Sequence, residues 1–125
     1  MRTVLIVDDE PDVRLAMAAT LEEAGIEAIV ADDGDTGCQA AIEKQPSAII
    51  LDINMPRVDG FEALRSLKND ARTTDIPVIL ITAGFSPGMW EFGQALGAAD
   101  AITKPWSDGE LLRHLEQAMN STSRC

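Results

Sequence analysis

Hydrophobic and polar positions along the chain alternate between two patterns, five times over. Short apolar runs rich in β-branched residues predict strands, and each run is followed by a longer stretch with helical spacing of its apolar residues. Three of the runs are apolar without interruption, which is typical of strands covered on both faces in a parallel sheet. The predicted strands are Thr3–Val7, Ala28–Ala31, Ala48–Leu51, Val78–Ile81 and Ala101–Thr103.

The stretches between these runs predict helices. Pro11 suits a first helical turn and Gly25 suits a helix end, so these two residues frame the first helix. The fourth helix contains Gly88 and Gly93, and we expect it to be the least stable because glycine costs up to about 1 kcal/mol relative to alanine in a helix interior. The predicted helices are Val13–Ala24, Thr36–Lys44, Phe61–Lys68, Gly88–Leu96 and Leu111–Met119.

This order of elements predicts the α/β class. Strands that alternate with helices through right-handed crossovers form a doubly wound parallel sheet with helices on both faces. A chain of 125 residues has room for one domain of this kind. We expect the domain to cover residues 1–120 and the polar residues 121–125 to form a frayed tail.

Composition and charge exclude several classes of protein. The net charge of −11, from 21 acidic and 10 basic residues, argues against direct nucleic-acid binding, which relies on clustered Lys and Arg. No apolar run approaches the roughly 20 residues of a membrane span. Cys38 and Cys125 do not suit a small secreted domain stapled by disulfides. We therefore expect a cytoplasmic protein that makes no membrane contact.

Polar residues follow four of the predicted strands. Asp8 and Asp9 come after the first strand and Asp52 after the third, while the fourth strand runs into Thr82 and the fifth into Lys104. Ligands of an open parallel sheet bind beyond the carboxyl ends of its strands. We therefore expect these side chains to meet in one crevice.

Three carboxylates in one crevice repel each other unless their pKa values rise or a cation binds among them. Carboxylate oxygens suit a hard divalent ion, so Mg²⁺, or Mn²⁺ in its place, is the expected cofactor. A phosphoryl group on Asp52 would bring further charge and acceptor oxygens, which the cation, the Lys104 ammonium and the Thr82 hydroxyl are able to hold. Thr82 would have to move to do so, and the loop after it leads into the weak fourth helix.

Together with their neighbours, these residues resemble the receiver domains of response regulators. The resemblance runs in order over essentially the whole chain and rests on five motifs at the spacing of strand–helix units. The motifs are Val7-Asp8-Asp9-Glu10, Leu51-Asp52-Ile53-Asn54-Met55-Pro56-Arg57-Val58-Asp59-Gly60, Ile81-Thr82-Ala83, Gly97-Ala98-Ala99-Asp100 and Thr103-Lys104-Pro105-Trp106. The resemblance implies one (βα)5 flavodoxin-like domain whose parallel five-stranded sheet has the strand order 2-1-3-4-5.

The resemblance also implies a role for each site residue. Asp52 would be the phosphoacceptor of a two-component, CheY-like signalling switch, assisted by Lys104 and Thr82. The phosphoryl donor would be a sensor histidine kinase or a histidine phosphotransfer protein. Beyond transfer to Asp52 and loss of phosphate from it, no enzymatic activity is expected. The implied Mg²⁺ ligands are Asp8 (chiefly through a water), Asp9, Asp52 and the backbone carbonyl of Asn54.

The output side of the switch stays open. The signal would reach an unknown partner protein or output domain through a change at the fourth helix and fifth strand, and the chain could act as a monomer or as a phosphorylation-dependent homodimer. Receivers usually carry Tyr or Phe three residues before the lysine, where this chain has Ala101. Phe85, Trp90 and Trp106 are the candidates to replace that aromatic ring. The resemblance further implies a cis peptide bond between Lys104 and Pro105.

Two other functions fit part of the pattern. A hydrolase of the haloacid-dehalogenase type would need a second Asp as general acid where this chain has Asn54, and an amide cannot take that role. An unphosphorylated pseudo-receiver adaptor would share the fold, and Ala101 is its one support, but such proteins typically lose the acceptor or the acidic pair.

Four further residues have structural interpretations. Asp8 and Asp9 could cap the first helix instead of lining a site. Cys38, in an Ala-rich helical pattern, is expected to be a small buried apolar residue. His114 is expected to be a solvated residue of the last helix, because a single histidine forms no metal cluster.

Overall fold

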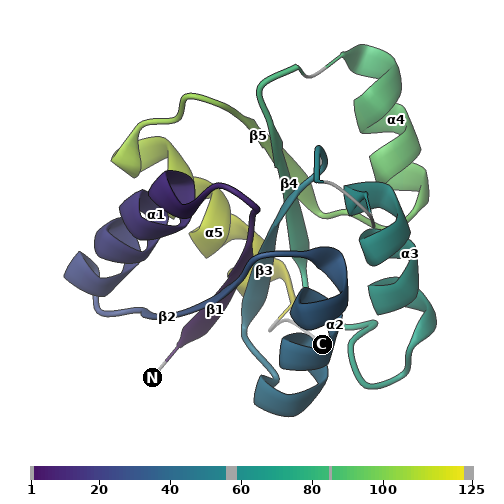
Figure 1. The fold of residues 1–125 in the computed structure, drawn as a ribbon, viewed down its shortest axis with the longest axis horizontal. Helices are drawn as coiled ribbons and strands as arrows, with labels where there is room; N and C mark the ends of the chain where they lie inside the picture. Colours follow the sequence, from purple (N-terminus) through teal and green to yellow (C-terminus); the bar gives the residue numbers. More distant parts are fainter. Residues whose placement is uncertain (1, 56–58, 85, 123–125) are drawn as a thin grey trace.

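Five parallel strands form the centre of the molecule in the computed structural model, which describes residues 2–55, 59–84 and 86–122 (Figure 1). The strands are hydrogen-bonded in the order β2-β1-β3-β4-β5, so the predicted doubly wound sheet and its strand order are confirmed. The strands are β1 (Thr3–Val7), β2 (Glu27–Ala31), β3 (Ala48–Asp52), β4 (Val78–Thr82) and β5 (Asp100–Thr103).

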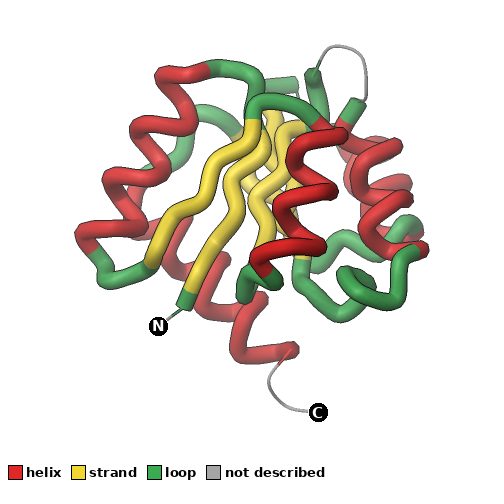
Figure 2. The backbone as a smooth tube through the Cα atoms, turned by 60° about the horizontal axis from the view of Figure 1, so that its bottom comes forward, coloured by secondary structure: helices red, strands yellow, loops and turns green. Residues whose placement is uncertain are grey.

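Five helices cover both faces of this sheet, with α1 and α5 on one side and α2, α3 and α4 on the other (Figures 1 and 2). Each predicted element is present, and its bounds differ from the prediction by at most three residues. The largest difference is in the last helix, which runs two residues into the predicted tail; residues 123–125 lie outside the described residues. The helices are α1 (Pro11–Glu23), α2 (Gly34–Lys44), α3 (Gly60–Asn69), α4 (Pro87–Ala95) and α5 (Asp108–Thr122).

The core consists of two hydrophobic clusters separated by the sheet. Successive residues of a strand point to opposite faces, so Leu5 and Val7 join the cluster under α2, α3 and α4, whereas Val4 and Ile6 join the cluster under α1 and α5. Both faces are covered, which explains why β1, β3 and β4 each contain a run of four consecutive apolar residues. Within the described part of the chain, no helix combines the length and the apolar character that a bilayer span requires.

Side-chain caps fix the starts of four helices, each through an oxygen that accepts a backbone N–H of the first turn. The capping residues are Asp33 for α2, Asp59 for α3, Ser86 for α4 and Ser107 for α5. Helix α1 differs, because Pro11 opens it and Glu10 precedes it without a side-chain cap. The alternative that Asp8 and Asp9 cap this helix is therefore wrong, and the Asp8 carboxylate contacts the Glu10 backbone N–H and Lys104 instead.

A glycine holds α3 close to the end of β3. A Cβ atom at Gly60 would lie 2.4 Å from the Cα atom of Ile53 and 2.5 Å from the backbone oxygen of Asp52. Real Cβ atoms do not approach backbone atoms so closely, so only glycine allows α3 to begin directly beside Asp52.

We predict opposite effects for two helix glycines. Gly60→Ala should lower the free energy of unfolding by about 2–4 kcal/mol, because backbone atoms beside Asp52 must move. Gly88→Ala should raise it by about 0.5–1 kcal/mol, because nothing lies within 4 Å of the added Cβ and alanine is the better helix former. Urea denaturation of both variants measures the difference. Equal effects of the two substitutions would contradict the close approach at Gly60.

Candidate functional site

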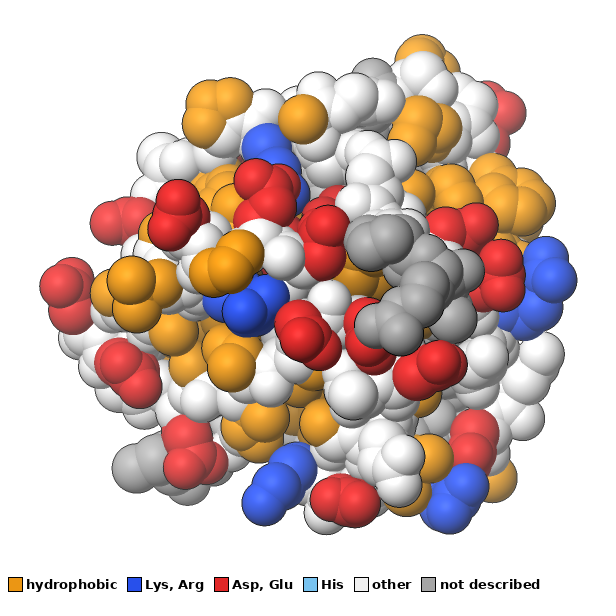
Figure 3. All heavy atoms as spheres, viewed as in Figure 1, with side chains coloured by type: hydrophobic (Ala, Val, Ile, Leu, Met, Phe, Trp, Pro, Cys, Tyr) orange, Lys and Arg blue, Asp and Glu red, His pale blue; other side chains and the backbone are white. Residues whose placement is uncertain are grey.

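The ends of four strands bring the predicted residues together at one edge of the sheet. Asp8 follows β1, Asp52 and Thr82 are the last residues of β3 and β4, and Lys104 follows β5. The backbone holds these ends in register, since the Lys104 N–H donates to the Thr82 carbonyl oxygen at 2.9 Å. Figure 3 shows several Asp and Glu side chains gathered on this face of the molecule, with few Lys and Arg among them.

The Lys104 ammonium lies at the centre of the site. Its Nζ atom is 3.1 Å from Asp8 Oδ2, 3.5 Å from Asp52 Oδ2 and 3.2 Å from Glu10 Oε1. The sequence correctly predicted that Asp8, Asp52 and Lys104 lie together, but it predicted no role for Glu10. Glu10 directly follows the acidic pair Asp8-Asp9, and this position was the one indication that its carboxylate could reach the site.

Burial makes Asp52 an unusual carboxylate. Its exposed fraction is 2 %, and its Oδ1 atom accepts the Asn54 backbone N–H at 3.0 Å. Loss of solvation raises the pKa of Asp52 to about 6, the charge of Asp8 adds to this, and the Asn54 N–H and Lys104 act in the opposite direction. The site therefore moves the pKa of Asp52 close to neutral pH.

Lys104 responds in the opposite sense to the same surroundings. Burial by itself lowers the pKa of the ammonium, but the contact with Asp8 and the charges of Asp52 and Glu10 outweigh it and leave the pKa above its usual value. Lys104 is therefore a permanent positive charge at neutral pH.

One carboxylate oxygen of Asp8 makes an ion pair but no hydrogen bond within the described part of the chain. Its Oδ1 atom accepts the Glu10 backbone N–H at 2.9 Å. Its Oδ2 atom is buried and has no hydrogen-bond partner among the described residues, because the Lys104 contact is an ion pair without hydrogen-bond geometry. The Lys104 ammonium offsets part of the charge of this oxygen, but a buried carboxylate oxygen without a hydrogen bond remains costly.

Four carboxylates are close enough to share one metal ion. One oxygen from each of Asp8, Asp9, Glu10 and Asp52 lies within 4.8 Å of the others. A set made only of carboxylate oxygens, one of them buried and without a hydrogen bond from the described residues, fits a hard divalent cation such as Mg²⁺. With Glu10 included, four carboxylates, one ammonium and one divalent cation would sum to a formal charge of −1.

Thr82 and Asn54 are connected to each other across the ends of β3 and β4. The fully buried Thr82 hydroxyl oxygen accepts Asn54 Nδ2–H at 2.8 Å and the Gly84 backbone N–H at 3.3 Å. The structure thus ties the Asn54 amide to the hydroxyl that was expected to move. The role of the Asn54 carbonyl as a metal ligand stays a prediction.

Three further predictions have a structural outcome. The Lys104–Pro105 peptide bond is cis, as the resemblance implied. The expectation for His114 is wrong, because its ring is partly buried and its Nδ1 atom contacts Asp100 Oδ2 across α5 and β5. Cys38 is half-buried instead of buried, and burial raises the pKa of its thiol.

Comparison with known proteins agrees with this geometry. The family model described as the response regulator receiver domain matches residues 4–116. Protein PilH of Pseudomonas aeruginosa is 35% identical over 119 residues, which are 95% of this chain and 98% of PilH. The phosphate regulon transcriptional regulatory protein PhoB of the same organism is 38% identical over 121 residues, which are 97% of this chain but 53% of PhoB. The chain therefore spans about half the length of that regulator.

Solved structures give the same result. The chemotaxis protein CheY4 of Vibrio cholerae superposes with a TM-score of 0.91 at 32% identity, and covers 94% of this chain and 98% of its own. The receiver domain of a sensor histidine kinase from Pseudomonas aeruginosa has a TM-score of 0.88 at 27% identity, with coverage of 95% and 98%. That structure has a magnesium ion coordinated in its active site cleft.

We predict that Asp52 destabilises the fold in the absence of divalent cations. The pKa of Asp52 in the folded state, about 6, lies above its value in the unfolded chain, about 4. The loss of folding free energy caused by ionised Asp52 is therefore absent below about pH 4, grows between about pH 4 and 6, and is constant above that range. In EDTA, Asp52→Asn should therefore exceed the wild type in free energy of unfolding by about 1–3 kcal/mol near pH 7.5 and by little near pH 4.

Denaturant unfolding at several pH values measures this difference. The variant Glu43→Gln, which removes an exposed carboxylate outside the site, serves as control. Added Mg²⁺ should stabilise the wild type more than the Asp52→Asn variant. A difference between wild type and Asp52→Asn that does not change with pH would contradict the raised pKa.

Proposed function

This chain belongs to the response regulator receiver family, and on that premise we propose that Asp52 is the residue on which it accepts a phosphoryl group. Receiver domains are signalling domains rather than conventional enzymes; histidine kinases phosphorylate them, and they regulate output domains. One observation carries the assignment: Asp52 is a buried carboxylate at a strand end, with the Lys104 ammonium 3.5 Å from its Oδ2 atom.

The proposed reaction transfers a phosphoryl group from a phosphohistidine of a sensor histidine kinase or a phosphotransfer protein. An Asp52 carboxylate oxygen attacks the phosphorus atom, so that a P–O bond forms while the N–P bond breaks. The imidazole nitrogen keeps the electron pair of that bond and takes up a proton. Asp52 has to be ionised to attack, and with a pKa of about 6 most of it is ionised at neutral pH. Lys104 then offsets charge on the phosphoryl oxygens.

Mg²⁺, or Mn²⁺ in its place, is the proposed cofactor. Asp9 and Asp52 would hold it directly, Asp8 would act chiefly through a water, and Asn54 would contribute its backbone carbonyl. When bound, the ion supplies positive charge against the phosphoryl oxygens. The unsatisfied oxygen of Asp8 and the close set of carboxylates support this proposal.

Thr82 is proposed as the residue that responds to the phosphoryl group. Its hydroxyl oxygen now accepts hydrogen bonds from Asn54 and Gly84. A phosphoryl oxygen near Asp52 would be a strong acceptor for the Thr82 hydroxyl proton. Turning toward it changes the contacts of the chain that leads from β4 to α4, which is the side through which we expect an output protein or domain to sense the change. Asn54, already committed to Thr82, offers no general acid for turnover of external phosphate esters.

The partner classes follow from the family and the charge. We propose a histidine kinase or histidine phosphotransfer protein as donor and a protein or protein domain as target, in the cytoplasm. The net charge of −11 opposes direct contact of this domain with nucleic acid. Both a monomer and a phosphorylation-dependent homodimer are compatible with this proposal.

Phosphorylation of Asp52 is directly testable. Treatment with acetyl phosphate or phosphoramidate in the presence of Mg²⁺ should add one phosphate to the wild type, as measured by intact mass spectrometry. Asp52→Asn should add none, whereas Asp12→Asn, which changes an exposed acid in the first turn of α1, should behave as the wild type.

Other outcomes separate the alternatives. A wild type that folds and binds Mg²⁺ but gains no phosphate from either donor would favour the unphosphorylated adaptor. Sustained release of phosphate from a generic phosphatase substrate would favour a hydrolase. A phosphate gain that survives Asp52→Asn would place the acceptor elsewhere.

A further inference from the structure

Two of the three large apolar side chains that are exposed in the described part of the chain border the same hollow. Leu15 of α1 is 72 % exposed and Val30 of β2 is 50 % exposed. The hollow between them has a volume of about 410 Å³, and Ala18 and Ala28 also line it. Single exposed apolar side chains are common, but side chains gathered around a hollow are typical of an interaction surface.

Strand β2 lies at one edge of the sheet, so only one of its sides is hydrogen-bonded to another strand (Figure 1). The Glu27 N–H donates to a residue that flanks β1, and the Ala31 carbonyl accepts from another. Alternate residues of β2 therefore face β1, whereas Ala28 and Val30 direct their N–H and C=O groups away from the sheet. None of the described residues bonds to these groups, so they are open to a further strand.

The side chains of β2 point alternately to the two faces of the sheet. Ala28 packs against the cluster under α1 and α5, and Ile29 packs against the cluster on the other face. Val30 therefore shares the α1 face with Ala28, and Glu27 shares the opposite face with Ile29. A strand added beside β2 would place every second side chain against Leu15 and Val30.

Acidic residues surround this edge of the sheet. Exposed Glu27 begins β2, exposed Asp32 follows its last residue, and Glu22 lines the hollow. Among the described residues that line the hollow, Arg14 is the one basic residue, and its Nη1–H already donates to the Asp8 carbonyl oxygen at 2.7 Å. The net charge of −11 adds to this local excess, so the edge attracts a positively charged partner.

We propose that the free edge of β2 binds an extended segment of a partner protein in which apolar residues alternate with Lys or Arg. The backbone groups of Ala28 and Val30 would bond to this segment, and the hollow beside Leu15 would receive its apolar side chains. Glu27 and Asp32 would attract its basic side chains. The surface does not include Asp52, so the inference does not depend on the proposed function.

A second copy of this chain fits the edge less well. Two antiparallel β2 strands that pair Ala28 of one copy with Val30 of the other would bring each Glu27 next to the Asp32 of the other copy. Like charges in such positions destabilise a strand pair, and two chains of net charge −11 also repel each other as a whole.

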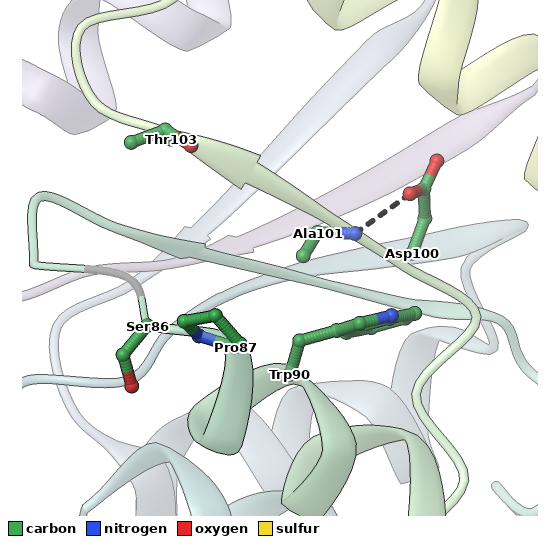
Figure 4. Close-up of a pocket in the computed structure, with 6 residues that line it drawn as sticks. All are labelled: Ser86, Pro87, Trp90, Asp100, Ala101 and Thr103. Carbon is green, nitrogen blue, oxygen red and sulfur yellow. Dashed lines mark hydrogen bonds between the residues drawn. The ribbon is translucent and has the colours of Figure 1, made fainter.

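The other edge strand, β5, borders a hollow of about 490 Å³ (Figure 4). Trp90 of α4 and Ala101 of β5 line it, but none of the three exposed large apolar side chains does. It also lies on the side of α4, through which we expect the output to sense phosphorylation. We therefore infer no separate binding site there.

Selection from a phage library of random peptides of about nine residues, panned against the whole chain, tests the proposal. Enriched sequences should alternate apolar residues with Lys or Arg. A synthetic peptide with the most enriched sequence should bind Leu15→Ser and Val30→Pro at least about tenfold more weakly than the wild type, as measured by fluorescence anisotropy. Phe92→Ser, which changes the third exposed large apolar side chain, should leave the affinity unchanged.

Both variants are compatible with the fold. Leu15→Ser changes an exposed side chain, and Val30→Pro removes an N–H that faces away from β1, so the ladder between β1 and β2 stays intact. N-methylation of alternate peptide residues tests strand pairing separately. The register that blocks the N–H groups facing β2 should abolish binding, whereas the other register should preserve it.

Several results would overturn the proposal. They are a selection without enrichment, enriched peptides that are acidic or lack the alternation, and binding that survives both Leu15→Ser and Val30→Pro. A dimer of the wild type in sedimentation equilibrium that Val30→Pro dissociates would place a second copy on the edge instead. Asp52→Asn should bind the peptide as the wild type does, which separates this test from that of the phosphorylation site.

Discussion

Compensation of buried negative charge at the strand ends is the constraint on which the rest of the structure depends. Asp8 and Asp52 are both almost fully buried, and one ammonium group, that of Lys104, contacts them and Glu10 together. A single cation does not satisfy three carboxylates, as indicated by the raised pKa of Asp52 and by the buried Asp8 oxygen, which accepts no hydrogen bond from the described residues. The apolar strands beneath the site hold these carboxylates close together. The negative charge that Lys104 does not compensate would favour binding of a divalent ion.

The sequence was sufficient to predict those site residues whose position depends only on the topology of the sheet. In a parallel sheet all carboxyl ends lie at one edge, so Asp8, Asp52, Thr82 and Lys104 could be placed together before any coordinates were known. The fold class followed from the alternation of strands and helices and from the continuous apolar runs, which are typical of strands covered on both faces. Motif resemblance then added the strand order and the cis bond at Pro105.

Contacts that depend on side-chain direction were not predictable in this way. Glu10 reaches back to Lys104, and His114 contacts Asp100, although neither pairing has a periodicity or a motif behind it. The hydrogen bond from Asn54 to Thr82 joins residues 28 positions apart through rotamers that the sequence does not specify. The packing of α4 was only partly predictable, since two glycines indicated a weak helix but not that one of them packs tightly on Leu80.

The division of the core into two clusters has a mechanical consequence. The sheet is a continuous hydrogen-bonded layer, and each strand sends alternate side chains into separate compartments. Repacking on one side of such a layer is not transmitted through shared side chains to the other. A change in packing beneath α2, α3 and α4 would therefore leave the side chains that hold α1 and α5 undisturbed.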